Sequence, residues 1–257
     1  MQGEKFRFRF SKTGDLRFVG HLDLMRCLER MLRRAALPFK STAGFHPSPR
    51  LVLALSLPLG VTGRNEVLEL ELVTPLDKDN VLTRLVAVAP AGLDFLCADV
   101  VEMKSTAVPR RAMYRYAPPI GIPAEVAGRA EQLLAQNKVW VNRLRPKPRQ
   151  LNIRPYLRDI RVRTDAVEFD IWVTAGGTAR ADELVSLLGL ADPADAVPFL
   201  ERTDLELHDE TPPGQPDGPP TDPAETRPLI HPPADGDDDR TTARATWGLS
   251  PAGPMVE

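Results

Sequence analysis

Lys5-Phe6-Arg7-Phe8-Arg9-Phe10, near the start of the chain, places a phenylalanine at every second position with basic residues between them. Because neighbouring side chains of a β-strand point to opposite faces of a sheet, this pattern predicts a half-buried strand. Residues 22–36 then change to helical spacing and predict an amphipathic helix with its arginines away from the core. The apolar residues on the buried face of this helix are Leu24, Met25, Leu28, Met31, Leu32 and Ala35.

The segments that follow complete an alternation of strands and helices. Residues 51–57 and 66–73 predict two strands, residues 77–89 a helix that begins after Thr74-Pro75, and residues 93–101 a further strand. The order β-α-β-β-α-β predicts an α+β fold, a ferredoxin-like sandwich over residues 1–104.

Residues 105–208 repeat this rhythm and predict a second α+β half-domain. The predicted strands cover 113–116, 139–144, 160–163, 167–173 and 199–207, and the predicted helices cover 124–136 and 181–190. An internal duplication fits this order, although the residues themselves do not repeat.

Residues 209–257 have the composition of a disordered acidic tail. This segment contains eleven of the 26 prolines and the run Asp235-Gly236-Asp237-Asp238-Asp239. With almost no aliphatic clusters, it cannot offset the entropy of ordering by burying apolar surface.

The composition of the 257 residues, 42% of them hydrophobic, suits one large domain or two small ones. Cys27 and Cys97 lie far apart and form no metal-binding spacing, so we expect no cofactor and no metal centre. No apolar run approaches the roughly 20 residues of a membrane-spanning helix. We therefore expect a soluble cytoplasmic protein without membrane contact.

Basic residues are concentrated in two regions of the predicted fold. Residues 1–50 carry eleven Lys or Arg against four Asp or Glu, net +7, and residues 138–163 carry nine against one, net +8. Residues 209–257 carry three against ten, net -7. Uneven charge of this kind predicts an anionic partner such as RNA.

Some of these arginines have acidic neighbours in the predicted sheet. We expect Arg7 and Arg9 to face Glu69 and Glu71 across a ladder of antiparallel strands. A turn at Asp165-Ala166 would likewise place Arg163 opposite Glu168 and Arg161 opposite Asp170. The basic residues left for nucleic-acid binding are Arg26, Arg30, Arg33, Arg34, Arg143, Arg145, Lys147, Arg149, Arg154 and Arg158.

The segment Arg143-Leu144-Arg145-Pro146-Lys147-Pro148-Arg149 has prolines that extend the backbone and no acidic residue close in sequence. Such a segment can follow a sugar–phosphate backbone and release counterions. The alternatives are an ordinary solvated loop, a site for the protein's own acidic tail, and a site for an acidic protein partner.

The loop formed by residues 41–50 combines Phe45, His46 and Arg50 with hydroxyl groups and two prolines. This combination suits the stacking of a base and contact with phosphate. A structural turn needs the same residue types, with Gly44 at positive φ and Phe45 in the core.

His21 and Asp23 lie where a glycine-containing turn enters the first helix. Either side chain can cap the free N–H groups of the first helical turn, contact a substrate, or act in acid–base catalysis. His46 is the other weak catalytic candidate, and three scattered ligands such as His21, Asp23 and His46 make a poor metal site.

Several motifs, in one order along the chain, resemble an uncharacterised bacterial family, the radical SAM-linked proteins, found beside or fused to radical S-adenosylmethionine (SAM) proteins. The motifs, within residues 5 to about 101, are Gly14-Asp15-Leu16-Arg17-Phe18-Val19-Gly20-His21-Leu22-Asp23-Leu24, Leu37-Pro38, Gly44-Phe45-His46-Pro47-Ser48-Pro49-Arg50 and Leu57-Pro58-Leu59-Gly60. Asn152-Ile153-Arg154-Pro155 is a weaker match. The family loop usually reads Gly-Phe-Asn-Pro-His-Pro, whereas this chain has His46 and Ser48 in the Asn and His positions, so no histidine role carries over. The resemblance implies a radical SAM partner.

The preferred hypothesis is a non-catalytic accessory protein that presents RNA, with transfer RNA as one candidate, to a radical SAM enzyme. The first alternative is a metal-independent RNA-processing enzyme that uses His21 or His46, by analogy with ferredoxin-like RNA-processing proteins of CRISPR systems. The second is a protein-only adaptor that docks the radical SAM partner.

Overall fold

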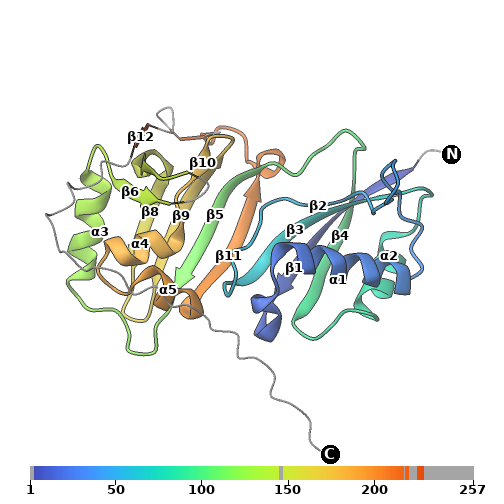
Figure 1. Ribbon diagram of the computed structural model, residues 1–257, viewed down its shortest axis with the longest axis horizontal. Helices are drawn as coiled ribbons and strands as arrows, with labels where there is room; N and C mark the ends of the chain where they lie inside the picture. Colours follow the sequence, from blue (N-terminus) through green and yellow to red (C-terminus); the bar gives the residue numbers. More distant parts are fainter. Residues whose placement is uncertain (1–2, 145–146, 217, 220–224, 229–257) are drawn as a thin grey trace, which may run out of the picture.

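The computed structural model describes residues 3–144, 147–216, 218–219 and 225–228. Within these ranges, nine strands form one large mixed sheet and three form a small sheet, which confirms the α+β class (Figure 1). The strands of the large sheet are β1 (Glu4–Lys12), β2 (Leu51–Leu53), β3 (Thr62–Leu72), β4 (Leu93–Val101), β5 (Pro109–Tyr116), β8 (Leu157–Val162), β9 (Val167–Thr174), β10 (Gly177–Thr178) and β11 (Leu200–Leu207). Those of the small sheet are β6 (Trp140–Arg143), β7 (Arg149–Asn152) and β12 (Thr226–Pro228).

The helices of the described chain are α1 (His21–Arg34), α2 (Lys78–Val86), α3 (Val126–Ala135), α4 (Ala181–Leu187) and α5 (Pro193–Ala196). Four short 3-10 helices accompany them: η1 (Gly14–Phe18), η2 (Arg154–Tyr156), η3 (Val197–Phe199) and η4 (His208–Glu210). Figure 1 shows α1 and α4 in front of the sheet, each over its own half of the molecule. We call the opposite face of the sheet the open face.

The first half pairs its strands in the order β4-β1-β3-β2, and every pair is antiparallel. Phe6, Phe8 and Phe10 are buried, as the alternating pattern predicted, and they pack with apolar residues of α1 and α2. The basic residues of β1 therefore lie on the open face.

The second half has the same strand order, β11-β5-β9-β8, again antiparallel throughout. Its own core gathers apolar residues of α3 and α4 with those of the four strands. The shared order agrees with the rhythm found in the sequence, while the internal duplication itself stays a prediction.

The long strand β3 joins the two halves. One edge of β3 pairs with β1, and the other edge pairs with β2 near its end and in parallel with β11 near its start. Gly63 sits at this junction, where a Cβ atom would lie 2.7 Å from Cγ of Glu66. The close approach requires glycine at that position.

Two parts of the fold differ from the sequence-based expectation. Strand β7, which the sequence did not predict, begins at Arg149, the last residue of the predicted basic loop, and it pairs with β6 while burying Leu151. The sequence also predicts that the tail starts at Asp209, but Asp209 and Glu210 belong to η4 and form ion pairs with β1. Residues 217, 220–224 and 229–257 of the expected tail lie outside the described residues.

Candidate nucleic-acid interface

Helix α1 presents arginines along its exposed side. Arg26 pairs with Asp23 at 2.9 Å and Arg33 with Glu29 at 2.8 Å, both between exposed side chains. Arg30 and Arg34 are exposed and have no ion pair among the described residues. Exposed pairs contribute only about 0–1 kcal/mol and open readily, so all four arginines remain available to an anion.

The loop of residues 41–50 forms a closed projection, which we call the arm. The backbone N–H of Thr42 donates to the carbonyl of Ser48 at 2.8 Å, and Ser48 N–H donates to Oγ1 of Thr42 at 3.1 Å. Gly44 has φ +131°, a conformation that favours glycine, as predicted. Phe45 has an exposed fraction of 102%, so the alternative that placed it in the core is wrong.

A groove of about 450 Å³ lies between α1 and the arm. Met25 and Arg26 line it from the helix, and Ser48 and Pro49 line it from the arm. His46 and Phe45 are exposed at the tip of the arm. The structure thus brings the basic helix and the aromatic loop, which are separate in sequence, to one continuous surface.

The base of the arm is also basic. Arg50 and Lys40 share one carboxylate, Glu71, at 3.4 and 3.0 Å. Two cations with one anion leave a net positive charge there. We refer to Arg26, Arg30, Arg33, Arg34, Phe45, His46 and Arg50 together as the α1–arm surface.

His21 is the first residue of α1 and is exposed at the same groove. Its Nδ1 lies 3.3 Å from the hydroxyl oxygen of Ser56. The N-cap residue is Gly20, which has no side chain, and the hydrogen bonds of the described chain include none from a backbone N–H to the side chain of His21 or Asp23. The side chains of His21 and Asp23 therefore do not cap the first turn of α1, contrary to that alternative. The described residues also contain no metal-binding cluster of His, Cys, Asp and Glu.

Arginines of the second predicted basic cluster form contacts within the folded protein. Arg143 has an exposed fraction of only 8%, and its guanidinium contacts both carboxylate oxygens of Glu183 at 2.8 Å. Arg154 donates to the carbonyls of Leu134 and Leu157. The sequence did not reveal this acidic partner, because Glu183 lies forty residues beyond Arg143.

Other members of that cluster have mixed surroundings. Arg158 pairs with Asp170 and lies 5.9 Å from the ring centre of Trp172. Lys147 is exposed and Arg149 is half-buried, and the described part of the chain contains no ion pair for either. Arg145 lies outside the described residues. The cluster therefore offers fewer free cations than its sequence suggests.

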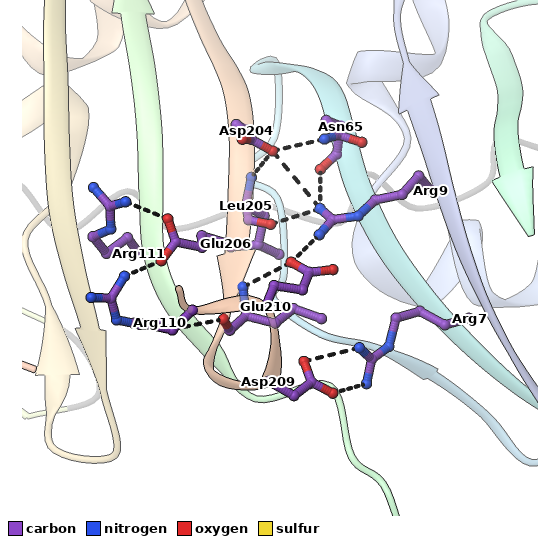
Figure 2. Close-up of polar contacts among 12 residues, drawn as sticks. Arg7, Arg9, Asn65, Arg110, Arg111, Asp204, Leu205, Glu206, Asp209 and Glu210 are labelled. Carbon is purple, nitrogen blue, oxygen red and sulfur yellow. Dashed lines mark hydrogen bonds and ion pairs between the residues drawn. The ribbon is translucent and has the colours of Figure 1, made fainter. Parts of the chain in front are cut away.

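The open face is neutralised by carboxylates, as Figure 2 shows. Arg7 pairs with Glu69 at 2.9 Å, as predicted, and also with Asp209 at 2.8 Å. Arg9 lies opposite Val67 and pairs with Glu210, so its predicted pairing with Glu71 is wrong.

The β8–β9 hairpin on the open face shows the same mixture. Arg163 forms the expected ion pair with Glu168, although the ladder places Arg161, and not Arg163, opposite Glu168. Arg161 pairs with Asp159 instead of Asp170. Interleaved acids of this kind disfavour a phosphate backbone.

A buried charged cluster at the junction of the two halves has no counterpart in the sequence-based expectations. Arg202, with an exposed fraction of 1%, donates from Nε to Glu66 at 2.8 Å, and Lys12 is buried beside them. Burial lowers the pKa of Lys12, the charge of Glu66 opposes this change, and Arg202 adds to it. The sequence signal that could have revealed the cluster is a charged residue, Glu66, at a core-facing position of a strand.

A family model matches residues 5–182, more than half of the chain. The chain belongs to DUF2344, an uncharacterised family of proteins conserved in bacteria. No curated protein matches the chain significantly. No helix in the described part of the chain is long and apolar enough to cross a membrane.

The DUF2344 region contains the whole α1–arm surface, together with Lys12 and Glu66. It ends inside α4, so Arg202 and Asp209 lie beyond it. Both the surface and most of the junction therefore belong to the part of the chain that defines family membership.

Proposed function

We propose that this DUF2344 protein is a non-catalytic accessory protein that binds RNA through the α1–arm surface. The observation that carries the proposal is the groove that Arg26 of α1 and Ser48 of the arm line together, with the fully exposed ring of Phe45 at the tip of the arm. Arg30 and Arg34 are exposed on the same helix and have no ion pair among the described residues. Arginines attract phosphates, and an exposed ring stacks on an unpaired base.

The arm favours unpaired nucleotides over a continuous duplex. In A-form RNA the bases are stacked and the major groove is deep and narrow, so an aromatic side chain reaches bases only in loops, bulges and ends. The proposed ligand is therefore a structured RNA with an accessible loop, and transfer RNA is the first one to test.

The proposed partner is a radical SAM enzyme, which would act on the RNA that this protein presents. Its support is the resemblance carried by the motifs around His21, the arm and residues 57–60. The strand order common to both halves supports the proposal of two ferredoxin-like half-domains. Fold alone is a weak guide to function, so the surface carries the argument.

The test is fluorescence anisotropy of labelled transfer RNA with the full chain in about 50 to about 200 mM salt. The double variant Arg30→Glu/Arg34→Glu is compared with Arg161→Glu/Arg163→Glu, which changes the charge equally on the open face. We expect the α1 variant to lose affinity and salt dependence and the control to retain both. Equal losses would show that net charge, and not this surface, governs binding.

A second candidate function is metal-independent RNA cleavage by His21. The contact of His21 with Ser56 favours it, because a second polar group fixes the imidazole at the edge of the groove. Cleavage of bound RNA by the wild type, lost in His21→Ala with binding intact, would select this candidate. Copurification of a protein partner with no affinity for RNA would instead select a protein-only adaptor.

A further inference from the structure

A pocket of about 190 Å³ lies at the junction of the two halves. One wall comes from residues 55–61, between β2 and β3, and the other comes from the start of α4 and from β11. Since one water occupies roughly 30 Å³, the pocket can hold a small heterocycle. Its walls are mainly apolar and include Leu55, Val61 and Leu200.

Arg202 makes the pocket rigid. Its guanidinium donates to the carbonyls of Leu55 and Ser56 at 2.9 and 3.2 Å, while Glu66 neutralises its charge. The backbone at the pocket rim is therefore fixed before any ligand arrives.

A hydroxyl and a carboxylate in the pocket wall can contact a ligand. The hydroxyl of Tyr114 accepts from Arg202 at 3.4 Å, so its own proton is left to donate. Asp182 also lines the pocket, and the described residues provide no hydrogen-bond donor to its side chain other than backbone. The pocket thus combines a neutral donor, the hydroxyl of Tyr114, with a carboxylate acceptor, and the exposed guanidinium of Arg180 also lines it.

The pocket adjoins the proposed RNA surface. Ser56 lines the pocket and contacts His21, and His21 lines the groove between α1 and the arm. A nucleotide that leaves the groove at the start of α1 therefore meets the pocket next.

We infer that the junction pocket binds one unpaired nucleobase that presents an amine beside a ring nitrogen acceptor, the edge of cytosine or adenine. This inference rests on the proposed RNA binding and adds a base-specific site to it. The exocyclic amine donates to Asp182, and the ring nitrogen accepts from Tyr114. Uracil places a carbonyl oxygen where the amine would be, so it faces the carboxylate unfavourably.

The test compares oligocytidine with oligouridine, each of about ten nucleotides, binding to the full chain. Both have the same charge, so the α1–arm surface treats them alike. We expect oligocytidine to bind about tenfold more tightly, the discrimination of one good base contact. In Asp182→Ala, which removes the acceptor, oligocytidine falls to within about twofold of oligouridine, whose affinity does not change. The control Asp195→Ala removes an exposed carboxylate outside the pocket and leaves the preference intact.

Different results overturn the two proposals. Equal binding of both oligomers by the wild type, or a preference that survives in folded Asp182→Ala, overturns the base pocket and leaves RNA binding standing. Tyr114→Phe is a second test of the pocket, because it removes the hydroxyl donor and keeps the aromatic ring. No binding of either oligomer at low salt overturns the proposed function itself.

Discussion

Nδ1 of His21 lies 3.3 Å from the hydroxyl oxygen of Ser56, which links the first residue of α1 to the segment between β2 and β3. A second contact joins the same two regions, because the backbone N–H of Gly60 donates to the carbonyl of Arg17 at 2.9 Å. Motifs some forty residues apart in sequence thus meet between the groove and the junction pocket. We propose that the RNA binds at this meeting point.

Phe45→Ala should weaken RNA binding without changing stability. The ring is fully exposed, so its removal leaves no cavity, while a lost stacking contact costs about 1–3 kcal/mol per base. Anisotropy should show a dissociation constant raised by roughly five- to a hundredfold. Phe45→Trp should retain affinity. Ile120→Ala removes another exposed apolar side chain, in the second half, and should have no effect.

Arg143→Ala should act on folding and not on RNA binding. Its guanidinium satisfies Glu183, which is itself largely buried, so its loss strands a carboxylate. Breaking a buried pair in this way costs about 3–5 kcal/mol, which urea unfolding can measure. Lys147→Ala, in the same basic segment but exposed, should change the free energy of unfolding by less than about 0.5 kcal/mol. A stable Arg143→Ala protein with weakened RNA binding would contradict the structural role.

Glu66→Gln should destabilise the protein strongly, because it leaves Arg202 and Lys12 buried without a carboxylate. We expect a loss of about 3–5 kcal/mol in the free energy of unfolding, measured in urea. Glu201→Gln is the matched control, since Glu201 pairs with the more exposed Arg64 close by, and should cost about 1 kcal/mol or less. Equal effects would show that the junction cluster is not a structural centre.

Acid should weaken the attachment of η4 to β1. Burial on its own would raise the pKa of Asp209, but the hydrogen bonds and charge of Arg7, with Ser105, hold that pKa below its usual value. A lowered pKa in the folded state contributes stability above the ordinary value, near 3.9, that is lost as pH falls through the folded value. Asp209→Asn should therefore reduce stability at neutral pH and flatten the decline below about pH 4. In Asp195→Asn the profile of unfolding against pH should match the wild type.

The sequence predicted those elements whose periodicity is local. The alternation in β1 and the apolar face of α1 identified both elements, and the limits of β4 agree with the structure because turns bound that strand. It predicted the pairing of Arg7 with Glu69 on neighbouring strands, but not the pairings that a strand makes with a helix. Arg143 of β6 pairs with Glu183 of α4, and Arg9 of β1 pairs with Glu210 of η4.

The candidate site was predictable in its parts and not in its assembly. The residue types alone pointed to the arginines of α1 and to the aromatic arm, because each feature lies within one short segment of the sequence. The sequence left open whether Phe45 lies in the core, and only its exposure in the structure excludes that position. The junction pocket uses Ser56, Tyr114 and Asp182, which come from separate elements and carry no motif.

Cross-linking of bound RNA identifies which surface of the protein the RNA contacts. Transfer RNA that carries photoreactive 4-thiouridine is bound to the full chain at low salt, irradiated, digested and mapped by mass spectrometry. We expect cross-links in residues 41–50 and in the first turn of α1, and their loss in Arg30→Glu/Arg34→Glu. Cross-links confined to β5, β8 and β9 on the open face would contradict RNA binding at the α1–arm surface. So would a cross-linking yield no higher than that of a control protein without affinity for RNA.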